Sequence, residues 1–294
     1  MESDKTATKP RKSGRVTGAL RALTRNKESI FGLAIVVSFL LIAAVVELST
    51  LLNVTILPYS PTAEVAPGAL PPSLKYLFGT DNLGRDLFSR IVSATPYDIA
   101  IGYIVVGSAF VIGALLGGYA GIRGGILDEI LMRFTDVFFA LPVLVLALVI
   151  AAVLGTGVTN MAIALMIVWW PAYARLARGE ALKVAHQNYI EAARLSGNGH
   201  RKILFRHVLP NISGTMLVYA TLDIGTVILV YSGLTYLGLA VHPPTPDWGE
   251  MVSDYHSYIL SAPWLALFPG LVISLGVIGF SLLGDGVKDA QETR

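Results

Sequence analysis

The stretch IAIGYIVVGSAFVIGALLGGY, residues 99–119, runs for 21 residues without a charged side chain. A bilayer core about 30 Å thick is crossed by ~20 apolar residues in a helix, because each helical residue adds about 1.5 Å. This stretch therefore predicts a transmembrane helix.

Five further apolar runs approach or meet the same length, at 30–46, 137–154, 158–174, 216–239 and 264–283. Of all six runs, only 216–239 holds a charged residue, Asp223. The whole chain is 54% hydrophobic and 14% charged, whereas a soluble domain carries about a quarter charged residues. With no cysteine in 294 residues, disulfide scaffolds and cysteine-ligated metal sites are excluded as well. We expect an all-α polytopic membrane protein with six transmembrane helices.

The distribution of Lys and Arg predicts the orientation of the chain in the cell membrane. The six runs imply a polar tail at 1–29, a first transmembrane helix at 30–46 and an outer loop at 47–98, followed by a five-helix core at 99–283 and a tail at 284–294. An even number of spans places both termini on one side, and 19 of the 22 Lys and Arg residues fall on that side. The positive-inside rule makes that side cytoplasmic, with the first helix retained as a signal anchor.

The outer loop at 47–98 divides into two parts. Its first part holds five prolines between positions 58 and 72, which favour extended or turning backbone. Its second part has Leu87, Phe88, Ile91 and Val92 at helical spacing, and we expect this short amphipathic segment to lie along the membrane surface.

The predicted transmembrane helices contain small residues and one acidic residue that need an explanation beyond hydropathy. Gly113, Gly117 and Gly121 form a ridge at a spacing of four, which lets another helix approach closely and predicts helix packing. Asp223 has two interpretations, because an acid in a span is costly unless it faces water or other helices. It is either part of a functional pathway, or it hydrogen-bonds to Thr221, Thr226 or a neighbouring helix and orients the bundle.

The main inner loop, 175–215, contains the sequence HQNYIEAARLSGNGHRKILFRHVLPN at 186–211. Asn188 is suited to cap a helix, with Glu191 three residues later, and Gly197 is suited to close it. The resulting helix of about two turns spans only ~12 Å and needs a surface to dock on. A second helix is expected to stop at Pro210. An amphipathic helix that touches lipid headgroups is the alternative.

These residues carry a resemblance to a known family. The loop resembles the EAA loop of bacterial and archaeal ABC-importer permeases. The resemblance lies in Glu191-Ala192-Ala193, followed by Gly197 and by Leu209-Pro210. Other segments resemble the dipeptide/oligopeptide permeases of that class. They are Gly79-Thr80-Asp81 with Gly84-Arg85-Asp86 and Ser89-Arg90, Asp128 with Met132-Arg133 and Asp136, Pro243-Pro244-Thr245-Pro246 with Trp248-Gly249, and Gly284-Asp285-Gly286.

The resemblance implies a type I importer permease fold of six helices, in which this chain pairs with a second, different permease. Two cytoplasmic ABC ATPases and an extracytoplasmic solute-binding protein complete the implied complex, which sits in membrane lipid and involves no nucleic acid. The short EAA helix is then the element that couples transport to an ATPase. The coupling residues by this resemblance are Tyr189, Ile190, Glu191, Ala192, Ala193, Arg194, Leu195 and Gly197.

The same resemblance assigns no catalytic residue and no metal or cofactor to this chain, and it places ATP and Mg on the partner ATPases. The sequence agrees, because no Gly-Lys dipeptide occurs and a phosphate-binding G-x-x-x-x-G-K-[ST] loop is therefore missing. Asp223 and Tyr231 are the candidates for the translocation pathway, although relatives commonly have an acid at the position of Tyr231.

The expected function is import of dipeptides or oligopeptides, with oligosaccharides or metal chelates as alternative solutes for the same class of importer. A secondary transporter is a more distant alternative, since such carriers often show duplicated halves and several buried ionisable groups. An intramembrane enzyme would have to use His242, Asp254 and His256, which share one outer loop but match no HExxH pattern.

Overall fold

The computed structural model describes residues 26–239 and 244–292, and in this part of the chain nearly all regular structure is helical. His242, Pro243 and most of the expected tail at 1–29 lie outside the described residues. The helices are α2 (Lys27–Leu51), α3 (Leu87–Arg123), α4 (Gly125–Phe139), α5 (Val143–Leu154), α6 (Val158–Ala185), α7 (Asn188–Leu195), α8 (His200–Ile203), the π-helix η1 (Leu204–Val208), α9 (Leu209–Tyr236), α10 (Trp248–Tyr255), the 3₁₀-helix η2 (His256–Tyr258) and α11 (Trp264–Glu292).

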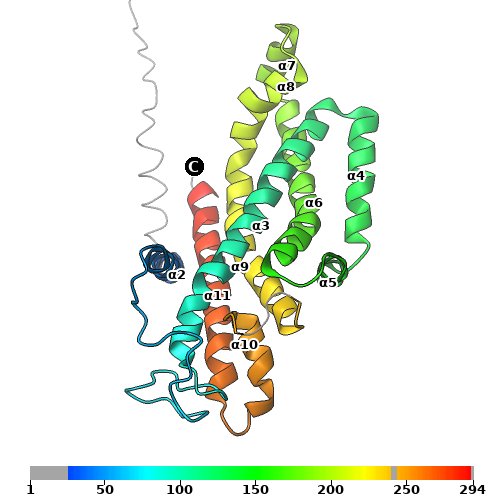
Figure 1. Ribbon diagram of the computed structural model, residues 1–294. Helices are drawn as coiled ribbons and strands as arrows, with labels where there is room; N and C mark the ends of the chain where they lie inside the picture. Colours follow the sequence, from blue (N-terminus) through cyan, green and yellow to red (C-terminus); the bar gives the residue numbers. More distant parts are fainter. Residues whose placement is uncertain (1–25, 240–243, 293–294) are drawn as a thin grey trace, which may run out of the picture.

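Four long helices form the body of the molecule. Figure 1 shows α3, α6, α9 and α11 running along the same general direction, while α2 and α5 are seen nearly end-on and therefore cross that direction steeply. The closest packing joins α3 to α6, and α11 packs against both α9 and α2. The hydrophobic core lies between these helices, around residues such as Val105, Leu165 and Ile228.

The glycine ridge of α3 faces α6. A Cβ atom built on Gly117 would lie 2.0 Å from the carbonyl oxygen of Ala174, and one on Gly113 would lie 2.3 Å from the Cβ of Tyr173. At Gly121 the nearest neighbours are the Cβ of Ala181 and the carbonyl oxygen of Arg178, both at 2.9 Å. The absence of side chains is therefore what lets the two helix backbones approach so closely.

The number of membrane spans differs from the simple expectation of six. Among the described residues, α2, α3, α8–α9 and α11 are long and apolar enough to cross a membrane, and the bent pair α4–α5 brings the number to five. α6 is not among them. Its sequence has polar residues near both ends, such as Asn160 and Lys183, and these lower the mean hydropathy of the helix. The all-helical membrane fold is thus observed, while six spans are not confirmed.

The expected span at 137–154 is wrong as a single helix. α4 ends at Phe139 and α5 begins at Val143, and their axes meet at 89°. Pro142 has φ −58° and ψ 132° directly before α5, which is an extended rather than a helical conformation. Proline has no amide hydrogen to donate and disfavours the helical conformation of the residue before it, so the helix breaks here.

The inner loop also departs from expectation at Pro210. The second helix does not stop there, because α8, η1 and α9 form one helical run from His200 to Tyr236. In the π turn, the amide of Leu209 donates to the carbonyl of Leu204, five residues back. Such a widened turn relieves the missing hydrogen bond and the ring clash that a proline brings to a regular helix.

Leu87, Phe88, Ile91 and Val92 do not form a separate surface helix. They are the first turns of α3, which continues without interruption into the apolar stretch and contains Pro96. Asp86 caps this helix, since its Oδ2 accepts hydrogen bonds from the amide and the hydroxyl of Ser89 at 2.8 and 2.6 Å. The helix therefore extends well beyond the bilayer length that the apolar stretch alone implies.

Candidate functional site

α7 projects at one end of the molecule, at the opposite end from α10 and the segment before α3 (Figure 1). Ile190 anchors it, because this side chain has no exposed surface and belongs to the hydrophobic core. Polar contacts add to this anchor: the amide of Asn211 donates to the hydroxyl of Tyr189 at 3.0 Å, and Arg194 donates to the carbonyl of Ile122 at 3.4 Å. A helix of eight residues is thus held on the bundle by one face.

The two ends of α7 differ in how they are capped. Asn188 is the first helical residue rather than the cap, and Gln187, which takes the cap position, makes no side-chain capping bond. The expected capping box is therefore absent. At the other end, Gly197 has φ +78°, and Asn198 donates its amide to the carbonyl of Ala193 at 3.1 Å. This left-handed closure is the one that glycine favours.

The outer face of α7 is open to its surroundings. Glu191, Ala192, Arg194 and Leu195 are all exposed, and the side chain of Leu195 keeps 90% of its surface. Small, charged and apolar side chains thus lie next to one another on a projecting, anchored helix.

Asp223 lies inside the bundle, on α9, where it bonds to α6. Its Oδ2 accepts hydrogen bonds from Trp169 Nε1 at 2.5 Å and from the Tyr173 hydroxyl at 3.1 Å. The expected local partners are not used: the hydroxyl of Thr221 donates instead to the carbonyl of Leu217. A hydrogen bond between Asp223 and a neighbouring helix, which one of the two interpretations requires, is thus observed.

Asp223 also lines a cavity of about 230 Å³ at the break between α4 and α5. The cavity is mostly apolar and aromatic. Its walls come from Phe138, Phe139, Leu141, Val143, Val168, Trp169, Pro171, Ala172, Tyr219, Asp223 and Thr226. Tyr231, the second pathway candidate, is not among them, because its side chain is fully buried and contributes no surface.

Two charged contacts join α4 to α6, and one of them lies next to the cavity wall at Phe139. Arg178 pairs with Asp128 through two hydrogen bonds, and Arg175 pairs with Asp136 while its Nε donates to the hydroxyl of Thr135 at 3.1 Å. The guanidinium of Arg175 also lies 4.0 Å from the ring centre of Phe139. Asp128 and Asp136, which match the family pattern, therefore attach α4 to α6 just before the break between α4 and α5.

At the opposite end, a buried ionic cluster joins the segment before α3 to α10. Asp81 accepts from Arg85 Nε at 2.6 Å and from the Tyr255 hydroxyl at 2.9 Å. Arg90 is 1% exposed and donates to the carbonyls of Pro61 and Pro244. Sequence reasoning noted Asp81, Arg85 and Arg90 only as matches to a family pattern, and it did not single out Tyr255. The presence of several charged residues in one predicted loop was the feature of the sequence that could have pointed to this cluster.

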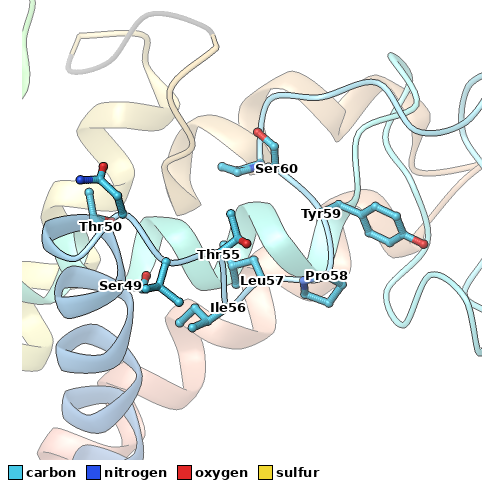
Figure 2. A pocket seen from close by; sticks show the side chains of 11 residues that line it. Ser49, Thr50, Thr55, Ile56, Leu57, Pro58, Tyr59 and Ser60 are labelled. Atoms are coloured by element: carbon cyan, nitrogen blue, oxygen red, sulfur yellow. The ribbon is translucent and has the colours of Figure 1, made fainter.

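A further hollow, of about 540 Å³, lies where α2 ends. Figure 2 shows Ser49 and Thr50 on the last turn of the helix and Tyr59 and Ser60 on the segment that follows. All of its lining comes from 49–61, and none of these residues is charged. In the described part of the chain, no group of three or more His, Cys, Asp or Glu residues is placed to hold a metal ion.

The chain matches known proteins over most of its length. The family described as "binding-protein-dependent transport system inner membrane component" matches residues 87–294, from α3 onwards. A dipeptide transport system permease protein of Alkalihalophilus pseudofirmus is 39% identical over 278 residues, 94% of this chain and 89% of the relative. A probable D,D-dipeptide transport system permease protein of Escherichia coli is 36% identical over 295 residues, which cover 100% of this chain and 97% of the relative.

A third relative shares a shorter region at higher identity. It is a glutathione transport system permease protein of Pectobacterium atrosepticum, 42% identical over 223 residues, or 76% of this chain and 74% of the relative.

Proposed function

Because the chain belongs to the family of binding-protein-dependent transport system inner membrane components, we propose that it is a permease subunit of an ATP-driven importer of small peptides. The family match over 87–294 carries this proposal. The relatives described above are named for dipeptides, D,D-dipeptides and glutathione, which is itself a small peptide. These names favour peptides over oligosaccharides or metal chelates as the solute.

The chain forms one half of a translocation pathway, together with a second permease. Large apolar side chains at its periphery support this arrangement, since α5 exposes Val145, Val149 and Val153 and a groove of about 630 Å³ lies between α3 and α4. Lipid or a partner helix must cover such surfaces in the membrane. An extracytoplasmic solute-binding protein delivers the peptide.

Energy comes from two cytoplasmic ATPases, which bind ATP and Mg. The chain itself carries no catalytic residue and no cofactor, and the family is described as a transport component. α7 lies at the cytoplasmic end and inserts its exposed face into an ATPase. Its anchoring through the buried Ile190 supports this role, because a force on the exposed face is transmitted directly to the core.

Transport proceeds by alternating access. ATP binding closes the partner ATPases, the coupling helix moves with them, and the bundle opens toward the binding protein. ATP hydrolysis then resets the complex. Gly197 closes the helix at its exposed end, and Glu191 is the acidic group of the exposed face.

The test is to replace Glu191 or Gly197 by alanine in the assembled transporter. We expect peptide uptake to fall at least about tenfold, and peptide-stimulated ATP hydrolysis to become independent of uptake, because the coupling surface is altered. At Gly197 the positive φ adds about 1 kcal/mol of backbone strain for alanine. The measurements are uptake of a labelled dipeptide and ATPase activity in proteoliposomes.

Two control variants are matched to these changes. Glu129→Ala removes an exposed acid from α4, and Gly199→Ala changes a glycine two residues away whose φ is not positive and which has open space around it. Both should leave coupled uptake unchanged. Normal coupled uptake by both Glu191→Ala and Gly197→Ala contradicts the assignment of α7 as the coupling helix.

A further inference from the structure

The carboxyl group of Asp223 has hydrogen-bond donors but no ion-pair partner among the described residues. Trp169 and Tyr173 both donate to Oδ2, and Oδ1 has no hydrogen bond to the described residues. The basic side chains that form ion pairs in the described chain are bonded to other acids. They are Arg85, Arg90, Arg175, Arg178 and Lys183. Two donors on a single oxygen suit the carboxylate form, which only accepts hydrogen bonds.

The surroundings of this carboxylate favour a cation. Trp169, Tyr219 and Phe138 line the same cavity of about 230 Å³, and the faces of aromatic rings attract cations within about 6 Å of the ring centre. The hydroxyl of Thr226 is a further acceptor in the lining. An acid without an ion-pair partner in the described residues, placed beside aromatic rings, suits a positively charged group.

The position of the cavity gives an independent reason to expect a polar ligand there. It lies at the 89° break between α4 and α5, where Leu141 and Val143 contribute to its wall. Irregular backbone at membrane depth is tolerated where it is buried in protein or lines a water-filled cavity. Many transport proteins place their solute and ion sites where helices are broken in this way.

We propose that Asp223 and the aromatic side chains around it form a subsite that binds the ammonium group of a peptide during its passage. The inference rests on the proposed function of peptide import and names the part of the peptide that the site recognises. An N-terminal ammonium carries three donors and a full charge, so Oδ1 accepts one of its hydrogen bonds while the aromatic faces contact its other sides. The volume of about 230 Å³ suits the amino end of a peptide rather than a long chain.

The first experiment compares substitutions at Asp223 in the complete transporter, reconstituted with its partner permease, ATPases and binding protein. Asp223→Asn keeps an oxygen that accepts from Trp169 and Tyr173 but removes the charge, so uptake of labelled L-alanyl-L-alanine should fall at least about tenfold. Asp223→Glu keeps the charge and should retain more uptake than Asp223→Asn. Thr221→Val, which changes a threonine on the same helix outside the cavity lining, serves as the matched control and should stay within about twofold of wild type.

Uptake by the unaltered complex separates the two proposals. If the wild-type complex imports L-alanyl-L-alanine and Asp223→Asn does so at the same rate, peptide import stands and the ammonium subsite is rejected. If the wild-type complex imports oligosaccharides and no peptide, the proposed function fails first.

A second measurement needs no variant. A hydrophobic carbodiimide modifies carboxyl groups in apolar surroundings, and mass spectrometry of the wild-type complex reports the modified fraction of Asp223. Millimolar L-alanyl-L-alanine should reduce this modification severalfold, whereas N-acetyl-L-alanyl-L-alanine, which lacks the ammonium group, should not. Equal protection by both peptides, or by neither, overturns the subsite.

Discussion

Glu250 illustrates how burial changes the chemistry of a single residue, here on α10 at the end of the bundle opposite α7. Its side chain is 6% exposed, and neither carboxyl oxygen has a hydrogen-bond partner in the described residues. Burial raises the pKa of this carboxyl from 4.5 to about 7, and the nearby acids Asp254 and Asp247 act in the same direction, while Arg90 and Arg85 oppose it. The folded chain therefore binds a proton here that the unfolded chain has already lost.

We predict that the thermal stability of the purified protein decreases as the pH rises from about 4.5 to about 7. In this window the folded state binds more protons at Glu250 than the unfolded state, so the free energy of unfolding falls with rising pH and is constant above it. Melting temperatures in detergent between pH 4.5 and 8 measure the slope. Glu250→Gln should flatten it by a few degrees over the range.

The matched control for this prediction is Glu64→Gln, which changes an exposed acid in the segment between α2 and α3. The control should melt with the same slope as the wild type. A Glu250→Gln variant with an unaltered slope shows that the proton resides elsewhere in the cluster, with Asp247 and Asp254, whose pKa values burial also raises.

At the scale of single elements, the contact between α3 and α6 depends on the size of a few side chains. The backbone atoms of Ala174 occupy the space that a Cβ on Gly117 would need. A backbone cannot move aside as a flexible side chain can, so even one methyl group must push the helices apart. Overpacking of this kind costs about 1–3 kcal/mol.

Gly117→Ala should therefore lower the melting temperature of the protein and the yield of assembled complex. Gly107→Ala is the control on the same helix, because nothing lies within 4 Å of a Cβ at that position. It should be neutral or slightly stabilising, since alanine has a higher helix propensity than glycine. Differential scanning fluorimetry and size-exclusion chromatography compare the two variants. Equal stability of both would show that the ridge does not set the distance between the helices.

At the scale of the whole molecule, two ends with different chemistry face away from each other. One end carries α7 and the basic segment around α8, and the other carries the proline-rich segment, the ionic cluster and α10 (Figure 1). The excess of Lys and Arg at the first end supports a cytoplasmic location for it. Leu195 and Leu74 are the most useful markers of the two ends, because both side chains are almost fully exposed.

Cysteine labelling tests this orientation without background, because the chain has no cysteine of its own. In sealed cells stripped of any outer barrier, a membrane-impermeant maleimide should label Leu74→Cys at once. In cells that lack the partner ATPases, which would cover α7, Leu195→Cys should be labelled only after the membrane is permeabilised. The unaltered chain is the negative control, and the reverse pattern of labelling contradicts a cytoplasmic α7.

Much of this protein was predictable from its sequence, because the signals involved are local. Apolar runs at 99–119 and 264–283 predict helices, since hydropathy and length act within one segment. The glycine spacing at 113, 117 and 121 predicts a packed face for the same reason. Gly197 marks the end of a helix because only a few residues accept a positive φ. The family resemblance also lay in short stretches of adjacent residues.

Contacts between residues far apart in the sequence were decided only by the tertiary structure. Asp223 bonds to Trp169, 54 positions away, and Asp81 bonds to Tyr255, 174 positions away. Pro142 breaks a helix while Pro210 is absorbed by a π turn, and proline chemistry by itself predicts neither outcome. The difference arises because a buried polar or strained group is stabilised by whichever partner the fold brings within about 3 Å, and that choice is made by packing across the whole bundle.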